Sequence, residues 1–536
     1  MLTRVAVVCV VAVSASALVL ISVEDLGAPG VPSFRDQICG LDEGWLELIR
    51  RGYAEERVGQ IAVLPRTPAY MAGGGRGWSH SGPWDYLQRV PLVFYGPGRI
   101  PPVGDVSRPA TTADIAPTIA ALLKGVVQAD GRVLSEVARV GRSLLRRSSP
   151  RLIVTVVLDG AGGNVLDRWR DEWPVLAGMM RDGVSYTAAR VGSSPSVTPA
   201  IHATLGTGRF PATHGISSVE MRDETGAVVD AFFDGTSARF LQVPTIAELW
   251  DEQNRNRALV GMIGHVPWHL GMIGKGAEAP RGDRDHAAWL DLESNRWITN
   301  EEHYELPAAF EDQSDLGSRL EELDASDGSR DRRWRGVPLD DESRIEEVPA
   351  FTEHHVEKLI EMIVQEGYGD DEITDLLFTN FKQIDLLGHY FNMASVQVRD
   401  AVAAGDAALG ALVDHLNDSV GRGDYVIIVT ADHGQQPDAA AVDGYGIDPT
   451  ELFADVVQRF GPVVQDVAPT EIFLDEDALA QGDHSIEDVA RFLGNYRLRD
   501  NAEGFFEQLF GSGKFSAGDR LLQMAVPATM LTRTDC

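Results

Sequence analysis

The chain contains long apolar runs separated by polar and glycine-rich segments. Nearly continuous apolar runs at 151–159, 373–381 and 424–431 are typical of strands that are buried on both faces of a parallel sheet. Residues 395–418, between the last two runs, predict a helix. Strands that alternate with helices indicate an α/β fold, so we predict a mostly parallel central sheet with helices on both faces.

The N-terminal part of the chain predicts a second set of elements. In order these are a short helix at 41–54, a strand at 57–65, a glycine-rich loop at 71–86, a strand at 89–96 and a helix at 111–125. A basic stretch at 139–150 follows them and is typical of a linker.

The N-terminus has the pattern of a targeting segment. Arg4 precedes an apolar run at 5–21 that only Ser14 and Ser16 interrupt. This pattern predicts a secretory signal peptide or a single-pass N-terminal membrane anchor, and therefore a secreted or cell-surface protein. No clean small-residue cleavage site follows the run, so the pattern leaves the choice between the two open.

Composition narrows the class of protein. Of the 536 residues, 44% are hydrophobic, which is enough for a large core and excludes wholesale disorder. Lys and Arg number 47 against 80 Asp and Glu, and the formal charge is −33. Because nucleic acids are bound through Lys and Arg, this acidity argues against a nucleic-acid-binding surface. The irregular acidic stretch at 251–349 predicts a cap inserted into the main domain.

Side chains suited to metal binding follow three of the predicted strands. Asp159 ends the first, Asp432 and His433 end the third, and Asp385 and His389 lie just beyond the second. Ligands bind at the carboxyl ends of strands in open α/β sheets, so we expect these groups to converge. The spacing of Asp385 and His389 puts both on one face of a helical turn. A mixture of Asp and His ligands favours zinc over magnesium.

Thr198 is a candidate nucleophile. It precedes Pro199, and proline is favoured at the first position of a helix. A hydroxyl at a helix N-terminus lies near backbone N–H groups that favour an alkoxide or a phosphate. An ordinary Thr N-cap is the structural alternative. A metal ion nearby would favour the nucleophile, because coordination lowers the pKa of a hydroxyl.

Four segments together resemble a known family. VVLDGAGG at 156–163, SVTPAIHATLGTGRFPATHGI at 196–216, TNFKQIDLLGHYF at 379–391 and VTADHG at 429–434 are similar to motifs of the alkaline phosphatase superfamily. The likeness is closest to its type I phosphodiesterase/nucleotide pyrophosphatase branch, in order and in spacing. The resemblance implies that the inserted cap at 251–349 would carry substrate specificity.

The resemblance also implies two zinc ions that are bridged by the phosphoryl group. One would be held by Asp159, Asp432 and His433, with Thr198 beside it. The other would be held by Asp385, His389 and one further histidine, which family members carry after the ADHG motif.

That further histidine is out of place in this chain. After Gly434 only His484 remains, and its neighbours do not resemble the ligand loop of the family. Residues 51–125, in contrast, are similar to the C-terminal segment of the family, including this loop, so His80 is the expected ligand and His484 the alternative. The chain therefore resembles a circular permutation of the family order. The expected organisation is a leader at 1–30, a permuted segment completing the catalytic domain at 31–150, the nucleophile-bearing core at 151–250, the cap at 251–349 and the ligand-bearing core at 350–536.

Two departures from the family pattern bear on the substrate. Val219 stands where family members often carry an Asn that contacts phosphate, and segment 261–271 offers no cation before Lys275, where monoesterases of this kind carry Lys and Arg. Fewer cations near the phosphate suit a singly charged diester better than a dianionic monoester.

The expected protein is an exported, zinc-dependent hydrolase of small phosphoric esters with a threonine nucleophile. A phosphomonoesterase is the alternative enzyme, and a metal-binding pseudoenzyme that serves as a surface interaction module is the alternative outside enzymes. The sequence does not indicate an oligomeric state.

The permutation also implies a disulfide. Of the three cysteines, Cys9 lies in the leader, and the permutation brings Cys536 next to the region of Cys39. An exported protein meets an oxidising compartment, where such a pair persists. Two unpaired cysteines near the chain ends are the alternative.

Overall fold

The computed structural model describes residues 31–67, 69–71, 79–138, 149–291, 293–294, 296–311, 316–339, 346–438, 440–442, 444–501 and 516–536. The expected leader at 1–30 and most of the expected linker lie outside these residues. Within the part of the chain that is described, no helix combines the length and the apolar character needed to cross a membrane.

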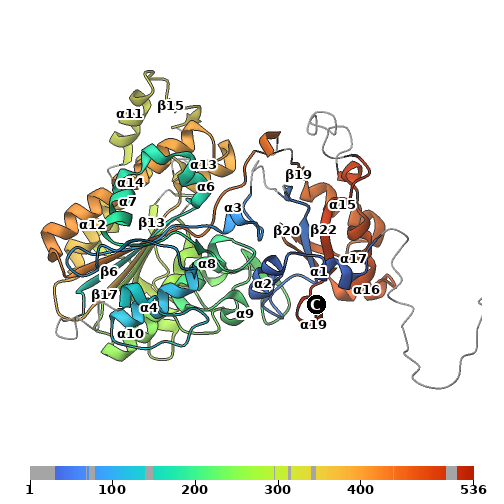
Figure 1. The fold of residues 1–536 in the computed structure, drawn as a ribbon, viewed down its shortest axis with the longest axis horizontal. Coiled ribbons are helices and arrows are strands. Elements are labelled where there is room, and N and C mark those ends of the chain that lie inside the picture. The colour runs from blue at the N-terminus through green and yellow to red at the C-terminus, as the bar shows by residue number, and fades with distance from the viewer. Residues whose placement is uncertain are drawn as a thin grey trace, which may run out of the picture.

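A large sheet forms the centre of the molecule (Figure 1). Among the described residues it has ten strands. In spatial order nine of them are β13 (Arg296–Ile298), β12 (Asp285–Asp291), β11 (Val260–Gly264), β17 (Asp375–Phe381), β6 (Leu152–Leu158), β18 (Tyr425–Thr430), β3 (Leu92–Tyr95), β7 (Val184–Tyr186) and β4 (Gly104–Val106), and β14 (Tyr304–Glu305) pairs with β12.

The sheet is mixed, and its centre is parallel. Strands β12, β11, β17, β6 and β18 run in one direction. Antiparallel pairing occurs towards the edges, between β12 and β13, β18 and β3, and β3 and β7. The predicted α/β fold with a mostly parallel sheet is confirmed, and every residue of β6, β17 and β18 is buried, as the apolar runs predicted.

Helices cover both faces of this sheet because successive residues of a buried strand point to opposite sides. In β6, Val154 and Val156 belong to one hydrophobic core, and Ile153 and Val157 belong to the other. The first core includes side chains of α7 (Pro174–Asp182), α12 (Pro349–Glu366) and α14 (Val396–Leu416). The second includes side chains of α4 (Ile115–Leu122), α8 (Thr198–Thr207) and α10 (Ile246–Asn254). The two sets of helices lie above and below the sheet in Figure 1.

A smaller lobe is built from both ends of the chain and lies beside the central sheet (Figure 1). Its antiparallel sheet has the order β20 (Val464–Ala468), β21 (Glu471–Leu474), β1 (Ile61–Pro65) and β22 (Leu522–Pro527). Its helices are α1 (Phe34–Cys39), α15 (Pro449–Phe460), α16 (Glu476–Gln481) and α17 (Ile486–Asn495). The N-terminal strand β1 therefore completes a sheet whose other strands come from the C-terminal part.

The remaining elements are short or peripheral. They are α2 (Glu43–Gly52), β2 (Tyr70–Met71), α3 (Asp85–Gln88), β5 (Ala110–Thr111), α6 (Gly163–Arg168), β8 (Ala189–Arg190), α9 (Pro211–His214), β9 (Glu220–Arg222), β10 (Val228–Asp230), α11 (Leu316–Ser326), β15 (Arg333–Trp334), β16 (Val337–Pro338), α13 (Gln383–Phe391), β19 (Gly446–Ile447) and α19 (Met530–Arg533).

The structure corrects the expected extent of the inserted cap. Strands β11 and β12 fall inside the expected range of 251–349, yet both belong to the central sheet. The hydrophobic pattern did not predict these strands, because β11 contains two glycines and the residues just before β12, at 275–284, are polar. What projects from the body is narrower, and consists of α11 and the β15–β16 hairpin at the top of Figure 1.

Cys39 and Cys536 form a disulfide with their Cα atoms 5.3 Å apart. The pairing inferred from the permuted order is confirmed, and the alternative of two unpaired cysteines is wrong. The bond ties α1 to the end of the chain.

Candidate active site

The carboxyl edge of the parallel strands carries the first group of candidate ligands. Asp159 follows β6, and its backbone N–H donates to the carbonyl of Phe381 at the end of β17 at 3.0 Å. Asp432 and His433 follow β18, the neighbour of β6 on its other side. All three side chains are fully buried. Parallel pairing therefore brings residues far apart in the sequence to one point.

Helix α13 carries the second group. Asp385 and His389 lie one turn apart, and His389 Nε2 is 3.4 Å from Asp385 Oδ1. The same Asp385 oxygen is 3.9 Å from His433 Nε2, so the two groups adjoin. The helix places both side chains where their spacing predicted.

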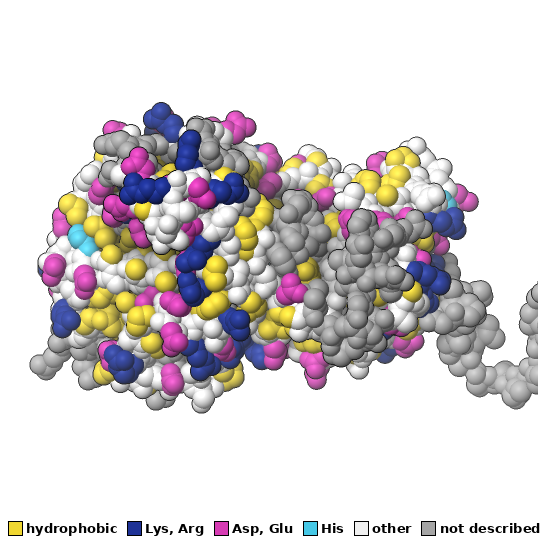
Figure 2. All heavy atoms as spheres, turned by 90° about the horizontal axis from the view of Figure 1, so that it is seen from above, with side chains coloured by type: hydrophobic (Ala, Val, Ile, Leu, Met, Phe, Trp, Pro, Cys, Tyr) yellow, Lys and Arg dark blue, Asp and Glu magenta, His cyan; other side chains and the backbone are white. Residues whose placement is uncertain are grey.

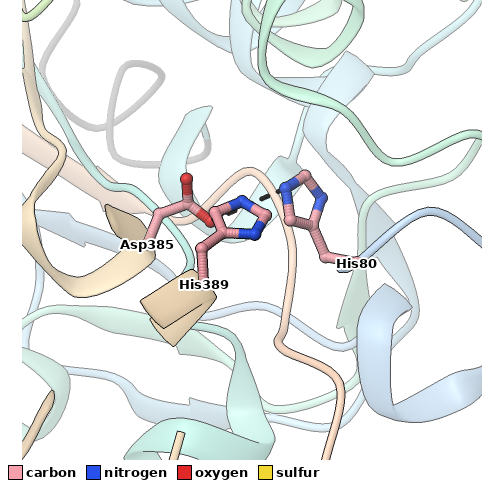
Figure 3. Close-up of side chains that lie close together, drawn as sticks. All are labelled: His80, Asp385 and His389. Carbon is pink, nitrogen blue, oxygen red and sulfur yellow. Dashed lines mark ion pairs between the residues drawn. The ribbon is translucent and has the colours of Figure 1, made fainter. Parts of the chain in front are cut away.

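His80 reaches this site from the loop before α3. Its Nδ1–H donates to the carbonyl of Ser196 at 2.9 Å, and the Ser196 hydroxyl donates back to the carbonyl of His80 at 2.9 Å. Its Nε2 is 3.6 Å from Asp385 Oδ1, and its ring centroid is 5.0 Å from that of His389 (Figure 3). The alternative, His484, instead packs against Phe460 in the smaller lobe.

Thr198 is the first residue of α8, and its side chain lies in the same pocket as His80, Asp385 and His389. Pro199 occupies the start of the helix, as the sequence indicated. The structure thus brings together all seven residues that the sequence singled out for this site.

Several buried ligand atoms have no hydrogen-bond partner. They are Asp385 Oδ1, Asp432 Oδ2 and His433 Nε2. A buried polar atom without a partner is costly, and native proteins rarely leave one. His433 donates its Nδ1–H to the carbonyl of Gly434 at 3.0 Å, as His80 does to Ser196, so both rings keep Nε2 as the lone-pair nitrogen.

The spacing of these atoms fits metal ions. His433 Nε2 is 3.3 Å from Asp432 Oδ2 and 3.6 Å from Asp159 Oδ1. Two ligands of a tetrahedral zinc ion lie about 3.3 Å apart when both bonds are about 2 Å long. The set of His80, Asp385 and His389 forms a comparable cluster. The donors present therefore suit a metal centre with two adjoining sites.

Burial perturbs the titration of the first group. Burial, with the charge of Asp432, raises the pKa of Asp159 to about 7, and burial raises the pKa of Asp432 to about 6. Burial also lowers the pKa of His433 to about 3. Burial thus outweighs the nearby charge of Lys382 at Asp159 and Asp432, and the imidazole of His433 stays neutral.

Lys382 is a residue of the site that sequence reasoning missed. It precedes α13, and its Nζ is 2.9 Å from Asp159 Oδ1, 2.8 Å from Asp385 Oδ2 and 2.9 Å from Thr198 Oγ1. Burial would raise the pKa of Asp385, but Lys382 outweighs it, with His389 and His80, and holds that pKa well below its usual range. The available signal was its place three residues before Asp385, one helical turn away.

A polar layer lies behind Thr198. Asn380 Nδ2 donates to Asp159 Oδ2 at 2.8 Å and lies 3.1 Å from His202 Nε2. His202 donates its Nδ1–H to the carbonyl of Thr198 at 2.7 Å. His269, which is fully buried, packs its ring 4.7 Å from that of His202. This layer orients Asp159 and the first turn of α8.

The site opens into a cavity of about 690 Å³ between the central sheet and the smaller lobe. Val219 and Trp268 line one wall, and Phe453 and Asp466 line the other. Lys275 lines a different cavity. Figure 2 shows that Lys and Arg side chains elsewhere on one face are interspersed with Asp and Glu.

The α/β fold and the Asp, His and Thr side chains at the carboxyl edge of its sheet define a class, that of enzymes that hydrolyse phosphoric esters. A family model described as type I phosphodiesterase / nucleotide pyrophosphatase matches residues 153–496, more than half of the chain. The chain belongs to this family, and the prediction that it is an enzyme acting on phosphoric ester bonds is confirmed.

Individual relatives are more distant. Alkaline phosphatase PafA of Elizabethkingia meningoseptica is 22% identical over 396 residues, which are 64% of this chain and 72% of that protein. A calcium-transporting ATPase of Myroides odoratus is 22% identical over 335 residues, 53% of this chain and 60% of that protein. The crystal structure of wild-type PafA matches with a TM-score of 0.52 at 21% identity, and covers 64% of this chain and 76% of that one. The structural likeness supports the fold.

Proposed function

We propose that this protein is an exported hydrolase of small phosphoric diesters that uses Thr198 as its nucleophile and two zinc ions as cofactors. One observation carries the proposal. Candidate ligand atoms without hydrogen-bond partners, on Asp385, Asp432 and His433, lie in one cluster, and Thr198 and Asp385 line a cavity large enough for a small ester. The disulfide suits an exported protein.

The residues divide into two proposed sets of metal ligands. Asp159, Asp432 and His433, with Thr198 beside them, would hold one ion. The other ion would be held by His80, Asp385 and His389. When bound, zinc supplies positive charge to the phosphoryl oxygens and lowers the pKa of a hydroxyl ligand.

Thr198 would carry the phosphoryl group between two displacement steps. In the first, Thr198 Oγ1 bonds to phosphorus, the ester P–O bond breaks, the hydroxyl proton passes to solvent and the departing oxygen takes a proton from water. In the second, a water oxygen bonds to phosphorus, the bond to Thr198 Oγ1 breaks and the hydroxyl regains a proton. The first step needs Thr198 Oγ1 in line with the ester bond that breaks, and the second needs the attacking water in line with the bond between phosphorus and Thr198 Oγ1.

The charges of the cavity support a diester substrate. Among the described residues that line it, Lys382 is the only Lys or Arg, whereas Glu220, Asp230, Asp385 and Asp466 contribute carboxylates. A phosphodiester carries one negative charge and meets less repulsion here than a dianionic monoester. A monoesterase is the second candidate, because one relative is named an alkaline phosphatase.

We also propose that the chain is a circular permutation of the family order. The support is that His80 comes from the N-terminal segment, that β1 pairs with β22, and that Cys39 bonds to Cys536. A variant that joins residue 536 to residue 31 and opens the chain within 139–150 should keep its metal content and activity. Loss of folding in that variant would count against the permutation.

The experiment compares bis(p-nitrophenyl) phosphate with p-nitrophenyl phosphate, before and after chelation and with zinc restored. We expect higher kcat/KM on the diester, loss on chelation and recovery with zinc. Thr198→Ala should lower kcat at least about 1,000-fold while the metal content is kept. Thr207→Ala, at the other end of α8, is the control, because its hydroxyl donates to the carbonyl of Ala203. Near-normal turnover by Thr198→Ala would remove the nucleophile from the proposal.

A further inference from the structure

Lys382 is held at the end of the cavity by three partners. Its ammonium contacts Asp159 Oδ1 at 2.9 Å, Asp385 Oδ2 at 2.8 Å and Thr198 Oγ1 at 2.9 Å. The residue is 3% exposed. A lysine ammonium has three N–H groups, so each has one acceptor and the group is fixed in orientation.

The three partners of Lys382 belong to different parts of the proposed site. Asp159 belongs to one proposed set of metal ligands and Asp385 to the other, so the ammonium joins the two sets. The third partner is the hydroxyl that would attack phosphorus. An isolated buried ammonium is costly, and here two carboxylates offset that cost. The position therefore places a permanent positive charge against the oxygen of the nucleophile.

The rest of the cavity provides no comparable charge among its described lining residues. Val219, which lines the cavity, offers no polar side chain, and Lys275 lies in another cavity. The carboxylates of Glu220, Asp230 and Asp466 add negative charge instead. Lys382 is thus the protein's own source of positive charge where the phosphoryl group must bind.

We propose that Lys382 is a catalytic residue of this site, whose ammonium aligns Thr198 Oγ1 and stabilises the negative charge that develops on that oxygen. This inference rests on the proposed role of Thr198. Lys382 stays protonated and exchanges no proton, so the bonds made and broken are those of the phosphoryl transfer. Oγ1 carries negative charge once the hydroxyl has lost its proton for the attack, and charge develops on it again when the phosphoryl group departs, so Lys382 acts in both steps.

Such a role predicts a particular kinetic signature. An interaction made mainly in the transition state lowers kcat when it is removed and leaves KM nearly unchanged. We expect Lys382→Met to lower kcat about 100-fold, the scale found for loss of one preorganised donor to a developing oxyanion. The zinc content, measured by mass spectrometry of the purified protein, should equal that of the wild type.

Lys358→Met is the matched control. Lys358, on α12, is the other buried lysine among the described residues, and it pairs with Glu361 at 2.9 Å without lining the cavity. We expect this control to keep kcat within about twofold. If Lys382→Met does not fold, Lys382→Gln takes its place with the same expectations.

A readout without turnover completes the test. Orthovanadate forms a covalent oxyanion adduct with a hydroxyl, whereas inorganic phosphate binds without a bond to Thr198. Calorimetry on the zinc-loaded protein should show vanadate binding weakened at least tenfold by Lys382→Met, and phosphate binding weakened less than threefold. Wild-type kcat in Lys382→Met, parallel loss of zinc and activity, or equal weakening of both anions would each overturn the proposal. A wild-type protein that hydrolyses neither ester would refute the proposed function, and the vanadate comparison would still test Lys382.

Discussion

The two histidines His80 and His433 have the same local arrangement. Each donates its Nδ1–H to a backbone carbonyl. The Nε2 atom of each lies near Asp385 Oδ1, at 3.6 Å for His80 and 3.9 Å for His433. Their rings stack with centroids 3.5 Å apart. Because the tautomer is set by the backbone, both nitrogens are ready to coordinate before a metal arrives.

His80→Ala tests the assignment of the third ligand at this scale. We expect this variant to retain about one zinc ion per chain instead of two, because Asp385 and His389 alone leave one site with two protein ligands. His484→Ala is the control and should retain both ions. Atomic absorption on dialysed protein measures the difference, and a full zinc complement in His80→Ala would show that His80 is not a ligand.

At the scale of elements, helix α8 and strand β6 place Thr198 against its neighbours. The start of α8 meets the end of β6 because Asn380, at the end of β17, hydrogen-bonds both to Asp159 and to His202 of α8. A shift of any of these elements would move Thr198 relative to Asp159. The geometry of the site is therefore a property of packed elements and not of a single loop.

The smaller lobe contains a buried acid at the junction of two strands. Glu471 begins β21, is 5% exposed and accepts a hydrogen bond from the backbone N–H of Gly59 at 2.6 Å. Burial raises the pKa of Glu471 to about 7. In the unfolded chain a Glu pKa is about 4.3, so between about pH 4.3 and pH 7 the folded state binds more protons than the unfolded state. Stability supplied by this group is present below that window and falls as the pH rises through it.

Glu471→Gln should remove this dependence, because an amide stays neutral at every pH. We expect the stability gain of the variant over the wild type to be larger at pH 8 than at pH 5, by on the order of 1–3 kcal/mol in the free energy of unfolding. Urea unfolding at both pH values measures it. Glu487→Gln, an exposed acid on α17, should change stability by less than about 0.5 kcal/mol at either pH. An equal effect of Glu471→Gln at pH 5 and pH 8 would contradict the assignment.

At the scale of the whole molecule, both chain ends enter one lobe. Strand β1 pairs with β22, and the disulfide joins residues 497 positions apart. Closing so long a loop restricts the unfolded chain strongly. The entropy model gives an upper value on the order of 5 kcal/mol for the stabilisation.

Reduction should therefore destabilise the protein measurably. We expect a reductant to lower the melting temperature of the wild type, and Cys39→Ser/Cys536→Ser to melt at the lower temperature with or without reductant. The double variant is thus its own control for side effects of the reductant. Two titratable thiols in a denatured, unreduced protein of residues 31–536 would show that the bond does not form.

The sequence alone determined the α/β class, because apolar runs such as 152–158 and 425–430 bury themselves on both faces whatever surrounds them. It also determined the chemistry at the ends of these strands, since Asp159, Asp432 and the pair Asp385/His389 follow from strand ends and helical spacing, which are local properties.

Only the tertiary structure decided the rest. Strand β11 is short and contains two glycines, and β12 follows a polar stretch, so neither was predicted from the sequence. They are strands because β17 pairs with β11 and β11 pairs with β12 in the central sheet. Lys382 lies one helical turn before Asp385, but its position against Thr198 exists only after α8, β6 and α13 have packed. Side chains acquire such partners from contacts between distant segments, which local patterns do not encode.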